Sequence, residues 1–321
     1  MSIIAGIDEA GYGPKLGPLV LTTVAIDIPV KYNNKINIWH LLKEAISDKI
    51  QKRRNRVVVH DSKKIYSQKS GLKILEEAVL SFIWCTKGQV TRFSDLLKLL
   101  SNYNEEVFNK YPWYKGKDID LPVASNVSAI LNYVDLVKNT ISLQEVSLLE
   151  VKSIFICAYE INKQLKLYGN KSLLLFKNSE KHLKGIFEQF GKNEPQVLID
   201  KHGGRNHYHK LLANSFEGCN VNAILEGNSI STYKISNERR KMNVSFAVGA
   251  DSKYFPTALA SMFSKYIREL FIRLFNEYWQ ERVHDIKPTA GYPEDAKRFL
   301  SQIHKTKNKL GISDDILIRV K

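Results

Sequence analysis

The sequence predicts an α/β fold, with short buried strands in a sheet and amphipathic helices packed on it. Two apolar runs near the start of the chain, residues 3–7 and 19–26, are bounded by turn residues and are typical of buried strands. The most regular helical pattern includes Pro256, which suits a first helical turn, and carries a broad apolar face as far as Phe275. We therefore expect the first two strands at the centre of the sheet and this helix in the core.

Further segments follow the same two patterns. Strands are predicted at residues 57–60, 197–200, 221–225, 229–235 and 246–251, with 221–225 and 229–235 near a sheet edge. Helices are predicted at residues 72–79, 94–100, 127–137 and 148–167. The region of about 90–150 is interpreted as a helical insertion. Its aromatic segment, residues 111–114, could stack on nucleobases, although packing on the core is the commoner fate of such side chains.

Charge and cysteine content narrow the class of protein. Lysine and arginine outnumber aspartate and glutamate by 48 to 33, and the resulting net charge of +15 favours a polyanionic partner, although many basic proteins have none. The three cysteines lie far apart without C-x-x-C spacing, so we expect buried thiols in a reducing compartment. No apolar run is long enough to span a bilayer and the N-terminus has no secretory pattern, which predicts a cytoplasmic protein without membrane contact.

The first strand leads into two adjacent acids, Asp8 and Glu9, and then into a glycine-rich segment. Adjacent side chains on a regular strand point to opposite faces, so both acids can serve one site only if the backbone bends after them, as Gly11 and Gly13 allow. Two buried carboxylates repel each other, and a divalent Mg²⁺ or Mn²⁺ ion would relieve that repulsion. A solvated acidic turn is the alternative. A dinucleotide loop is disfavoured because the glycines do not follow G-x-G-x-x-G spacing.

The segment from Asp8 to Val20, DEAGYGPKLGPLV, resembles the first signature of the type 2 ribonucleases H, the ribonuclease HII and HIII families, roughly DEAGRGPLAGPVV. Similar motifs follow in the family's order. DSKK at residues 61–64 resembles the second signature, DSKKL, and residues 197–200 resemble the third, a hydrophobic run ending in Asp-Gly. Residues 249–269 are similar to the fourth, GDAKYxxVAAASIxAKVxRD, and residues 291–293 resemble GYPT.

This resemblance implies an RNase H-like mixed sheet flanked by helices, with the helical insertion and a C-terminal helical region. We accordingly expect a catalytic domain over residues 1–285 and a helical extension over residues 286–321 that packs on it. The implied activity is that of a metal-dependent endonuclease, which hydrolyses the RNA strand of RNA/DNA hybrids and leaves 5'-phosphate and 3'-hydroxyl ends.

The resemblance also implies which residues act. The expected catalytic residues and metal ligands are Asp8, Glu9, Asp200 and Asp251, with Asp8 shared by both ions. Four converging carboxylates demand neutralisation, which two Mg²⁺ or Mn²⁺ ions about 4 Å apart would supply. The expected substrate-binding residues are Gly11, Tyr12, Gly13, Lys63, Lys64, Ser261, Lys265 and Tyr292.

Three positions depart from the family pattern. Tyr12 stands where ribonuclease HII carries arginine, Lys201 replaces the glycine after Asp200, and Glu294 replaces the threonine of GYPT. Tyrosine offers no cation, which predicts weaker incision at a single embedded ribonucleotide than in longer hybrids. Ribonuclease HIII also lacks that arginine, but it carries an extra N-terminal domain, for which Asp8 comes too early.

Two other functions remain open. The same fold could belong to a catalytically inactive nucleic-acid-binding protein, although a binder of polyanions has no use for four clustered acids. His207 and His209 have the His-x-His spacing of a zinc site, against a basic phosphate-contacting loop as the alternative, and the rest of a metallohydrolase pattern is missing. A histidine near the scissile phosphate, with His202 as a third candidate, could also aid proton transfer.

Overall fold

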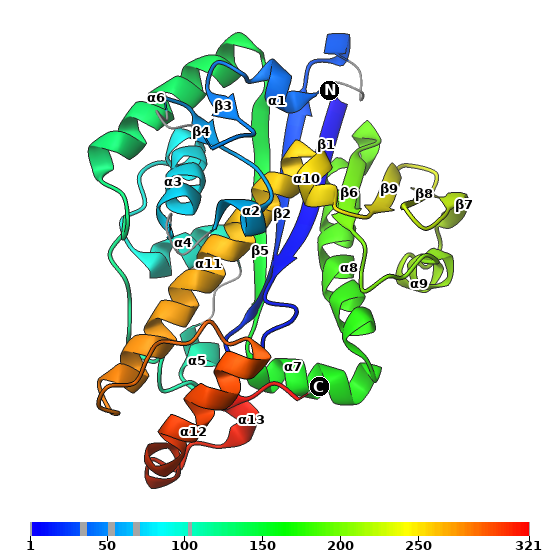
Figure 1. Cartoon of the computed structure of the whole chain (residues 1–321). Helices are drawn as coiled ribbons and strands as arrows, with labels where there is room; N and C mark the ends of the chain where they lie inside the picture. The colour runs from blue at the N-terminus through cyan, green and yellow to red at the C-terminus, as the bar shows by residue number, and fades with distance from the viewer. Residues whose placement is uncertain (1, 33–36, 51–54, 67–70, 102–104, 321) are drawn as a thin grey trace.

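The computed structural model describes residues 2–32, 37–50, 55–66, 71–101 and 105–320. Its centre is a seven-stranded sheet in the spatial order β5–β2–β1–β6–β9–β8–β7 (Figure 1). The strands are β1 (Ser2–Ala10), β2 (Leu19–Ile28), β5 (Ser147–Ile156), β6 (Gln196–Asp200), β7 (Asn220–Glu226), β8 (Ile230–Ser236) and β9 (Lys241–Ala247). A separate parallel pair consists of β3 (Ile46–Ser47) and β4 (Val57–Val58).

The sheet is mixed, and β1 lies at the change of direction. β1 pairs antiparallel with β2, with Asp8 opposite Thr22, and parallel with β6, with Ile7 opposite Ile199. β9 continues the parallel part beside β6, whereas β8 and β7 form an antiparallel hairpin at the edge. The predicted mixed sheet, with the first two strands central and residues 221–235 at an edge, is confirmed.

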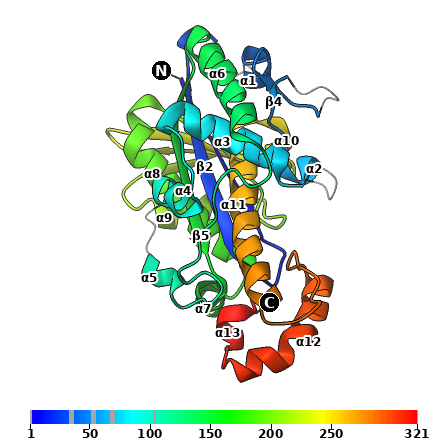
Figure 2. The same cartoon turned by 90° about the vertical axis from the view of Figure 1, so that its left-hand side faces the viewer.

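Helices cover both faces of this sheet. They are α1 (Ile38–Leu41), α2 (Ser62–Ile65), α3 (Lys73–Lys87), α4 (Phe93–Leu100), α5 (Glu105–Phe108), α6 (Val127–Leu143), α7 (Ala158–Tyr168), α8 (Lys171–Phe190), α9 (His209–Ser215), α10 (Ala250–Lys253), α11 (Phe255–Gln280), α12 (Pro293–Lys309) and α13 (Asp314–Leu317). Figure 2 shows α8 and α9 on one side of the sheet and α10 and α11 on the other.

The two faces follow from the alternation of side chains along β1. Ile3, Ala5 and Ile7 belong to the apolar cluster that includes side chains of α8, whereas Ile4 belongs to the cluster around α3 and α11. Helix α11 approaches β1 very closely, because a Cβ on Gly6 would lie 2.1 Å from the backbone nitrogen of Thr257. The sheet residues on the α11 face, Asp8 among them, are therefore held against this helix.

The predicted helix at residues 148–167 is wrong. Residues 147–156 form β5, which pairs antiparallel with β2, and the helix α7 begins only at Ala158. The segment alternates Leu149, Val151 and Phe155 with more polar residues, and its partner strand has a free edge that it completes, so pairing overrides the helical spacing of its apolar residues. The predicted strand at 57–60 is also shorter than expected, since only Val57 and Val58 pair.

The region of about 90–150 is helical up to β5, with α4, α5 and α6. Its aromatic residues pack on the core. Trp113 contacts Phe275 edge-on at 5.2 Å between ring centroids, and Tyr114 contacts Phe271 at 5.0 Å. Helix α12 packs on α11, because Phe299 lies against Phe275.

The division into a catalytic domain with an insertion and a C-terminal extension stays a prediction. Among the described residues, no helix has the length and apolar character needed to cross a membrane.

Candidate active site

Four acids gather at one end of the inner strands of the sheet. Asp8 and Glu9 lie near the end of β1, Asp200 is the last residue of β6, and Asp251 lies in α10, the short helix that follows β9. Because β1, β6 and β9 are parallel neighbours, these positions meet at the same end of adjacent strands. Asp251 differs slightly from the prediction, since it stands in a helical turn after the strand.

The electrostatics of these carboxyl groups show how closely they lie. Burial raises the pKa of Asp8 well above its usual value, and the charges of Glu9, Asp251 and Asp200 raise it further. Burial and the charge of Asp200 raise the pKa of Glu9 to about 7. For Asp251, burial and the charges of Asp61 and Asp200 raise the pKa to about 6. The site is thus short of positive charge.

The serines of α11 hold Asp8 in place. Only 6% of Asp8 is exposed, and its carboxylate forms a hydrogen bond with Ser261. The hydroxyl of Ser261 lies 2.8 Å from that of Ser62, and Ser264 donates to the backbone oxygen of Asp8 at 3.0 Å. Ser261 is therefore buried between Asp8 and α2, and its expected contact with a substrate phosphate stays a prediction.

Lys63 is a cation whose charge acts on Glu9 and Asp251. Asp61 caps α2 by accepting the backbone N–H of Lys63 at 2.8 Å. Burial disfavours the charged ammonium of Lys63, yet its pKa is raised because Asp8 and Asp251 lie nearby. Asp61, which belongs to the DSKK motif, is a further acid of the site that the expected metal ligands do not include. Lys64 is exposed on the same helix.

Two other predicted contacts lie farther along the same face. Lys265 places its ammonium 2.7 Å from Glu269 and over the ring of Tyr66. Tyr292 is 52% exposed beside the glycine-rich loop, where a Cβ on Gly13 would lie 3.9 Å from its ring. Their roles in substrate binding remain predictions.

The backbone bends after the acids, as the glycines indicated. Gly11 has a φ of +93°, and a Cβ there would lie 2.6 Å from the carbonyl oxygen of Pro18 and 2.7 Å from Nε of Arg268, so only glycine fits. Arg319 from the C-terminal segment fixes the same loop. Its guanidinium donates to the carbonyl oxygens of Gly17, at 2.7 Å, and of Gly11, at 2.5 Å.

The three histidines after Asp200 have separate partners. His202 is buried, and burial together with the charge of Arg205 lowers its pKa to about 3, so it is a neutral core side chain at ordinary pH. Nδ1 of His207 lies 2.7 Å from Glu226, whereas Nε2 of His209 lies 2.9 Å from the carbonyl oxygen of Val221. These contacts tie the segment to β7.

In the part of the chain that the structure describes, no three Asp, Glu, His or Cys side chains are arranged around a common point where a metal ion could sit. The donor chemistry nevertheless fits a divalent cation, because Mg²⁺ and Mn²⁺ prefer carboxylate oxygens and because burial and the charges of neighbouring acids raise the pKa values of Asp8, Glu9 and Asp251, so that a cation would stabilise their charged forms. Binding would require these side chains to turn toward one point.

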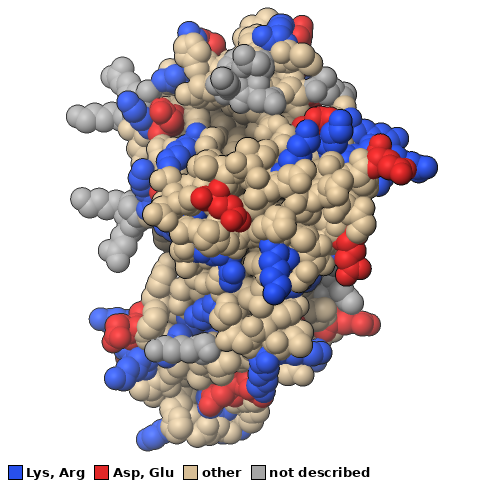
Figure 3. Space-filling model, turned by 90° about the vertical axis from the view of Figure 1, so that its right-hand side faces the viewer, with Lys and Arg blue, Asp and Glu red and all other residues tan. Residues whose placement is uncertain are grey.

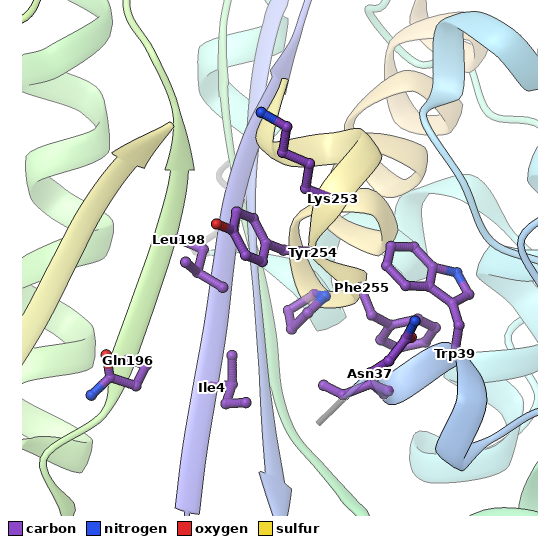
Figure 4. Close-up of a pocket in the computed structure, with 10 residues that line it drawn as sticks. Ile4, Asn37, Trp39, Gln196, Leu198, Lys253, Tyr254 and Phe255 are labelled. Atoms are coloured by element: carbon purple, nitrogen blue, oxygen red, sulfur yellow. The ribbon is translucent and has the colours of Figure 1, made fainter. Parts of the chain in front are cut away.

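A separate cavity of about 450 Å³ lies beyond α10, at the beginning of β1 and β6. Figure 4 shows Trp39, Phe255, Ile4 and Leu198 around it, with the Lys253 side chain directed away from the rings. The Lys253 ammonium instead donates to the carbonyl oxygen of Val248 at 2.7 Å. This apolar cavity is distinct from the carboxylate site.

We expect the acids to destabilise the metal-free protein as pH rises. A carboxyl group with a raised pKa binds its proton more tightly in the folded chain than in the unfolded chain, so its contribution to stability is present at low pH and is lost as pH rises through the folded value. For Asp251 and Glu9 this window runs from about 4 to about 7.

The measurement is the melting temperature in EDTA for the wild type and for Asp251→Asn. The variant minus wild-type difference should increase from pH 4 to pH 7, and Mg²⁺ or Mn²⁺ at pH 8 should raise the melting temperature of the wild type more than that of the variant. Taking the difference removes the opposite pH dependence of His182 and His202, whose pKa values are lowered to about 3. A difference that is constant with pH would contradict the expectation.

The chain thus has a mixed α/β fold with a buried cluster of acids at the ends of adjacent strands. No protein-family model matches it, and no curated protein matches its sequence. Solved structures similar to it include ribonuclease HII of Archaeoglobus fulgidus in its complex with PCNA, at 14% identity and a TM-score of 0.46, covering 99% of this chain and 94% of that chain.

Two further structures are similar. Ribonuclease H2 from Pyrococcus horikoshii OT3 has 14% identity and a TM-score of 0.44, covering 98% of this chain and 92% of that chain. Bst-RNase HIII in complex with Mn²⁺ has 13% identity and a TM-score of 0.43, covering 99% of this chain and 66% of that chain. By their descriptions these three structures are a ribonuclease HII, a ribonuclease H2 and a ribonuclease HIII.

Proposed function

We propose that this protein is a metal-dependent endoribonuclease that hydrolyses the RNA strand of RNA/DNA hybrids and leaves 5'-phosphate and 3'-hydroxyl ends. The observation that carries the proposal is the gathering of Asp8, Glu9, Asp200 and Asp251 at one end of adjacent strands, where burial and the charges of neighbouring acids raise the pKa values of Asp8, Glu9 and Asp251. Such a cluster repels a polyanion unless cations intervene, so it is of use to an enzyme that binds divalent ions and a phosphodiester together.

In this proposal each group of residues has a separate task. The four acids would hold divalent cations, two of them according to the family that the motifs resemble, and Lys63 would donate to a substrate phosphate. A divalent cation, when bound, supplies charge neutralisation and lowers the pKa of a nucleophilic water. Gly11 and Gly13 let the substrate ribose approach the backbone, and Tyr292 offers an exposed ring for stacking.

The net charge of +15 supports a nucleic-acid partner. Figure 3 shows Lys and Arg side chains together with Asp and Glu side chains on the face that carries the β7–β8–β9 end of the sheet, and the proposal assigns the turn between β8 and β9 no substrate contact. Lys201, which replaces the family's glycine, does not neutralise the acids. Its ammonium donates to the side chain of Asn206 at 2.7 Å and to the carbonyl oxygen of Gly227. The cytoplasmic location stays a prediction.

The deciding experiment uses three end-labelled duplexes of one sequence: RNA/DNA hybrid, double-stranded RNA and double-stranded DNA. We expect cleavage of the hybrid alone, within the RNA strand, in Mg²⁺ or Mn²⁺ and not in EDTA. Binding of the hybrid without cleavage under every metal condition would instead support the inactive binding protein. Cleavage that is lost in His207→Ala and His209→Ala, but kept in Asp251→Asn, would support a histidine-ligated zinc enzyme.

Tyr12 is expected to weaken incision at a single embedded ribonucleotide relative to cleavage of a long hybrid. Burial and the charge of Glu9 raise the pKa of Tyr12, so the side chain stays neutral and offers a hydroxyl where ribonuclease HII offers a guanidinium. The measurement is the ratio of kcat/KM for the two substrates. Tyr12→Arg should shift this ratio toward the single ribonucleotide, with Tyr12→Phe as the control that removes only the hydroxyl. Equal rates of the wild type on both substrates would refute the expectation.

A further inference from the structure

The loop after Asp200 carries a cation, Arg205, to which the sequence motifs assign no role. Two successive glycines with left-handed backbone, Gly203 at a φ of +59° and Gly204 at +78°, turn the chain sharply. The turn is closed by a hydrogen bond from the backbone N–H of Arg205 to the carbonyl oxygen of His202, at 3.2 Å. The loop thereby returns toward the glycine-rich loop after β1.

Arg205 and Tyr12 lie in the same place. A Cβ on Gly203 would be 3.4 Å from the hydroxyl of Tyr12 and 3.7 Å from Cβ of Ser172, so the two loops meet there. Nε of Arg205 lies 3.4 Å from the hydroxyl of Ser172, which itself donates to the carbonyl oxygen of His202 at 3.0 Å. The charges of both Glu9 and Arg205 act on the Tyr12 phenol. The guanidinium is therefore held at the rim of the carboxylate site.

This guanidinium has no acidic partner among the described residues. No carboxylate oxygen of theirs lies within 4.0 Å of it, whereas Arg92, Arg273 and Arg298 each pair with a carboxylate. Arg205 is partly exposed, and Ser172 engages only its Nε. Its two terminal nitrogens keep their N–H donors for an anion, and a guanidinium binds phosphate oxygens with two parallel hydrogen bonds.

We propose that Arg205 binds a backbone phosphate of the substrate strand next to the ribose that contacts Tyr12. The proposal rests on the proposed function, since it names a further substrate-binding residue of the same site. The other basic residue of this loop, Lys201, is held on Asn206 and Gly227, so the loop offers one available cation at this position rather than a diffuse basic patch. The phosphate contact fixes the strand without reading its sequence.

The test is hybrid binding measured by fluorescence anisotropy, with Asp8→Asn as a cleavage-silent background in Mg²⁺. In that background we compare Arg205→Ala and Arg205→Lys with Arg239→Ala, which removes the same charge from the exposed turn between β8 and β9. Arg205→Ala should weaken binding by roughly tenfold and lower the slope of log K against log salt concentration by about one. Arg205→Lys should recover part of the affinity, and Arg239→Ala should change it by less than about twofold.

Equal effects of Arg205→Ala and Arg239→Ala, or an unchanged salt slope in Arg205→Ala, would overturn the proposal. Arg205→Gln keeps a donor for Ser172 and replaces the alanine variant if that variant fails to fold. Cleavage by the wild type separates the two levels of inference. If the wild type cleaves hybrids and the Arg205 variants bind like the Arg239 control, only the phosphate contact is wrong, whereas an inactive wild type contradicts the proposed function itself.

Discussion

Asp8→Asn is expected to lower the rate of hybrid cleavage by at least about a thousandfold. Asp8 is buried, with 6% of its surface exposed, and the charges of the other three acids all act on it. Asparagine keeps the shape and one oxygen but lacks the charge that holds a divalent cation. The loss should therefore appear in kcat at saturating metal concentration.

The same substitution should not unfold the protein. Because Asp8 is buried among like charges, removing its charge relieves repulsion and should raise the melting temperature in EDTA at pH 8. This opposite effect on activity and stability separates a catalytic role from a structural one. Asp120→Asn is the matched control, since its side chain is 91% exposed and lies away from the acids. If the Asp8→Asn variant cleaves the hybrid as fast as the wild type does, the nuclease assignment is wrong.

The central strands and the long helix could be predicted because their local patterns agree with their environment. β1 and β2 are continuous apolar runs that are buried on both faces, and α11 has apolar residues at helical spacing with a proline in its first turn. The positions of Asp200 and Asp251 at the ends of apolar runs were also visible in the sequence. That these acids act as metal ligands was implied by the resemblance and stays a prediction.

The remaining features depend on contacts between distant residues. Residues 147–156 are a strand because β2 offers them an edge, which no local pattern reveals. Arg319 is 302 residues from Gly17, whose carbonyl oxygen it binds, and nothing near Arg319 in sequence signals this contact. Asp61 and Arg205 join the site only because α2 and the loop after β6 fold over it. The local spacing of apolar residues cannot predict such contacts.

The same dependence on distant contacts makes Glu76 a position where we expect a large loss of stability. Glu76 is fully buried in α3, and its carboxylate accepts the backbone N–H groups of Val123 at 2.6 Å and Ser125 at 2.7 Å and the hydroxyl of Tyr266 at 2.8 Å. This one side chain therefore joins α3, the loop before α6 and the helix α11 that holds Asp8.

Glu76→Ala would leave these buried donors without an acceptor, and we expect it to lower the free energy of unfolding by roughly 3 to 5 kcal/mol. Glu76→Gln should lose a comparable amount, because its amide group would place N–H donors against the N–H groups of the loop. Urea denaturation gives the value, with Glu277→Gln as control, since Glu277 forms an exposed pair with Arg273 and should change stability by less than about 1 kcal/mol. A Glu76→Gln variant as stable as the wild type would mean that the loop is held by other contacts, because a buried carboxylate that only accepts hydrogen bonds has no neutral substitute.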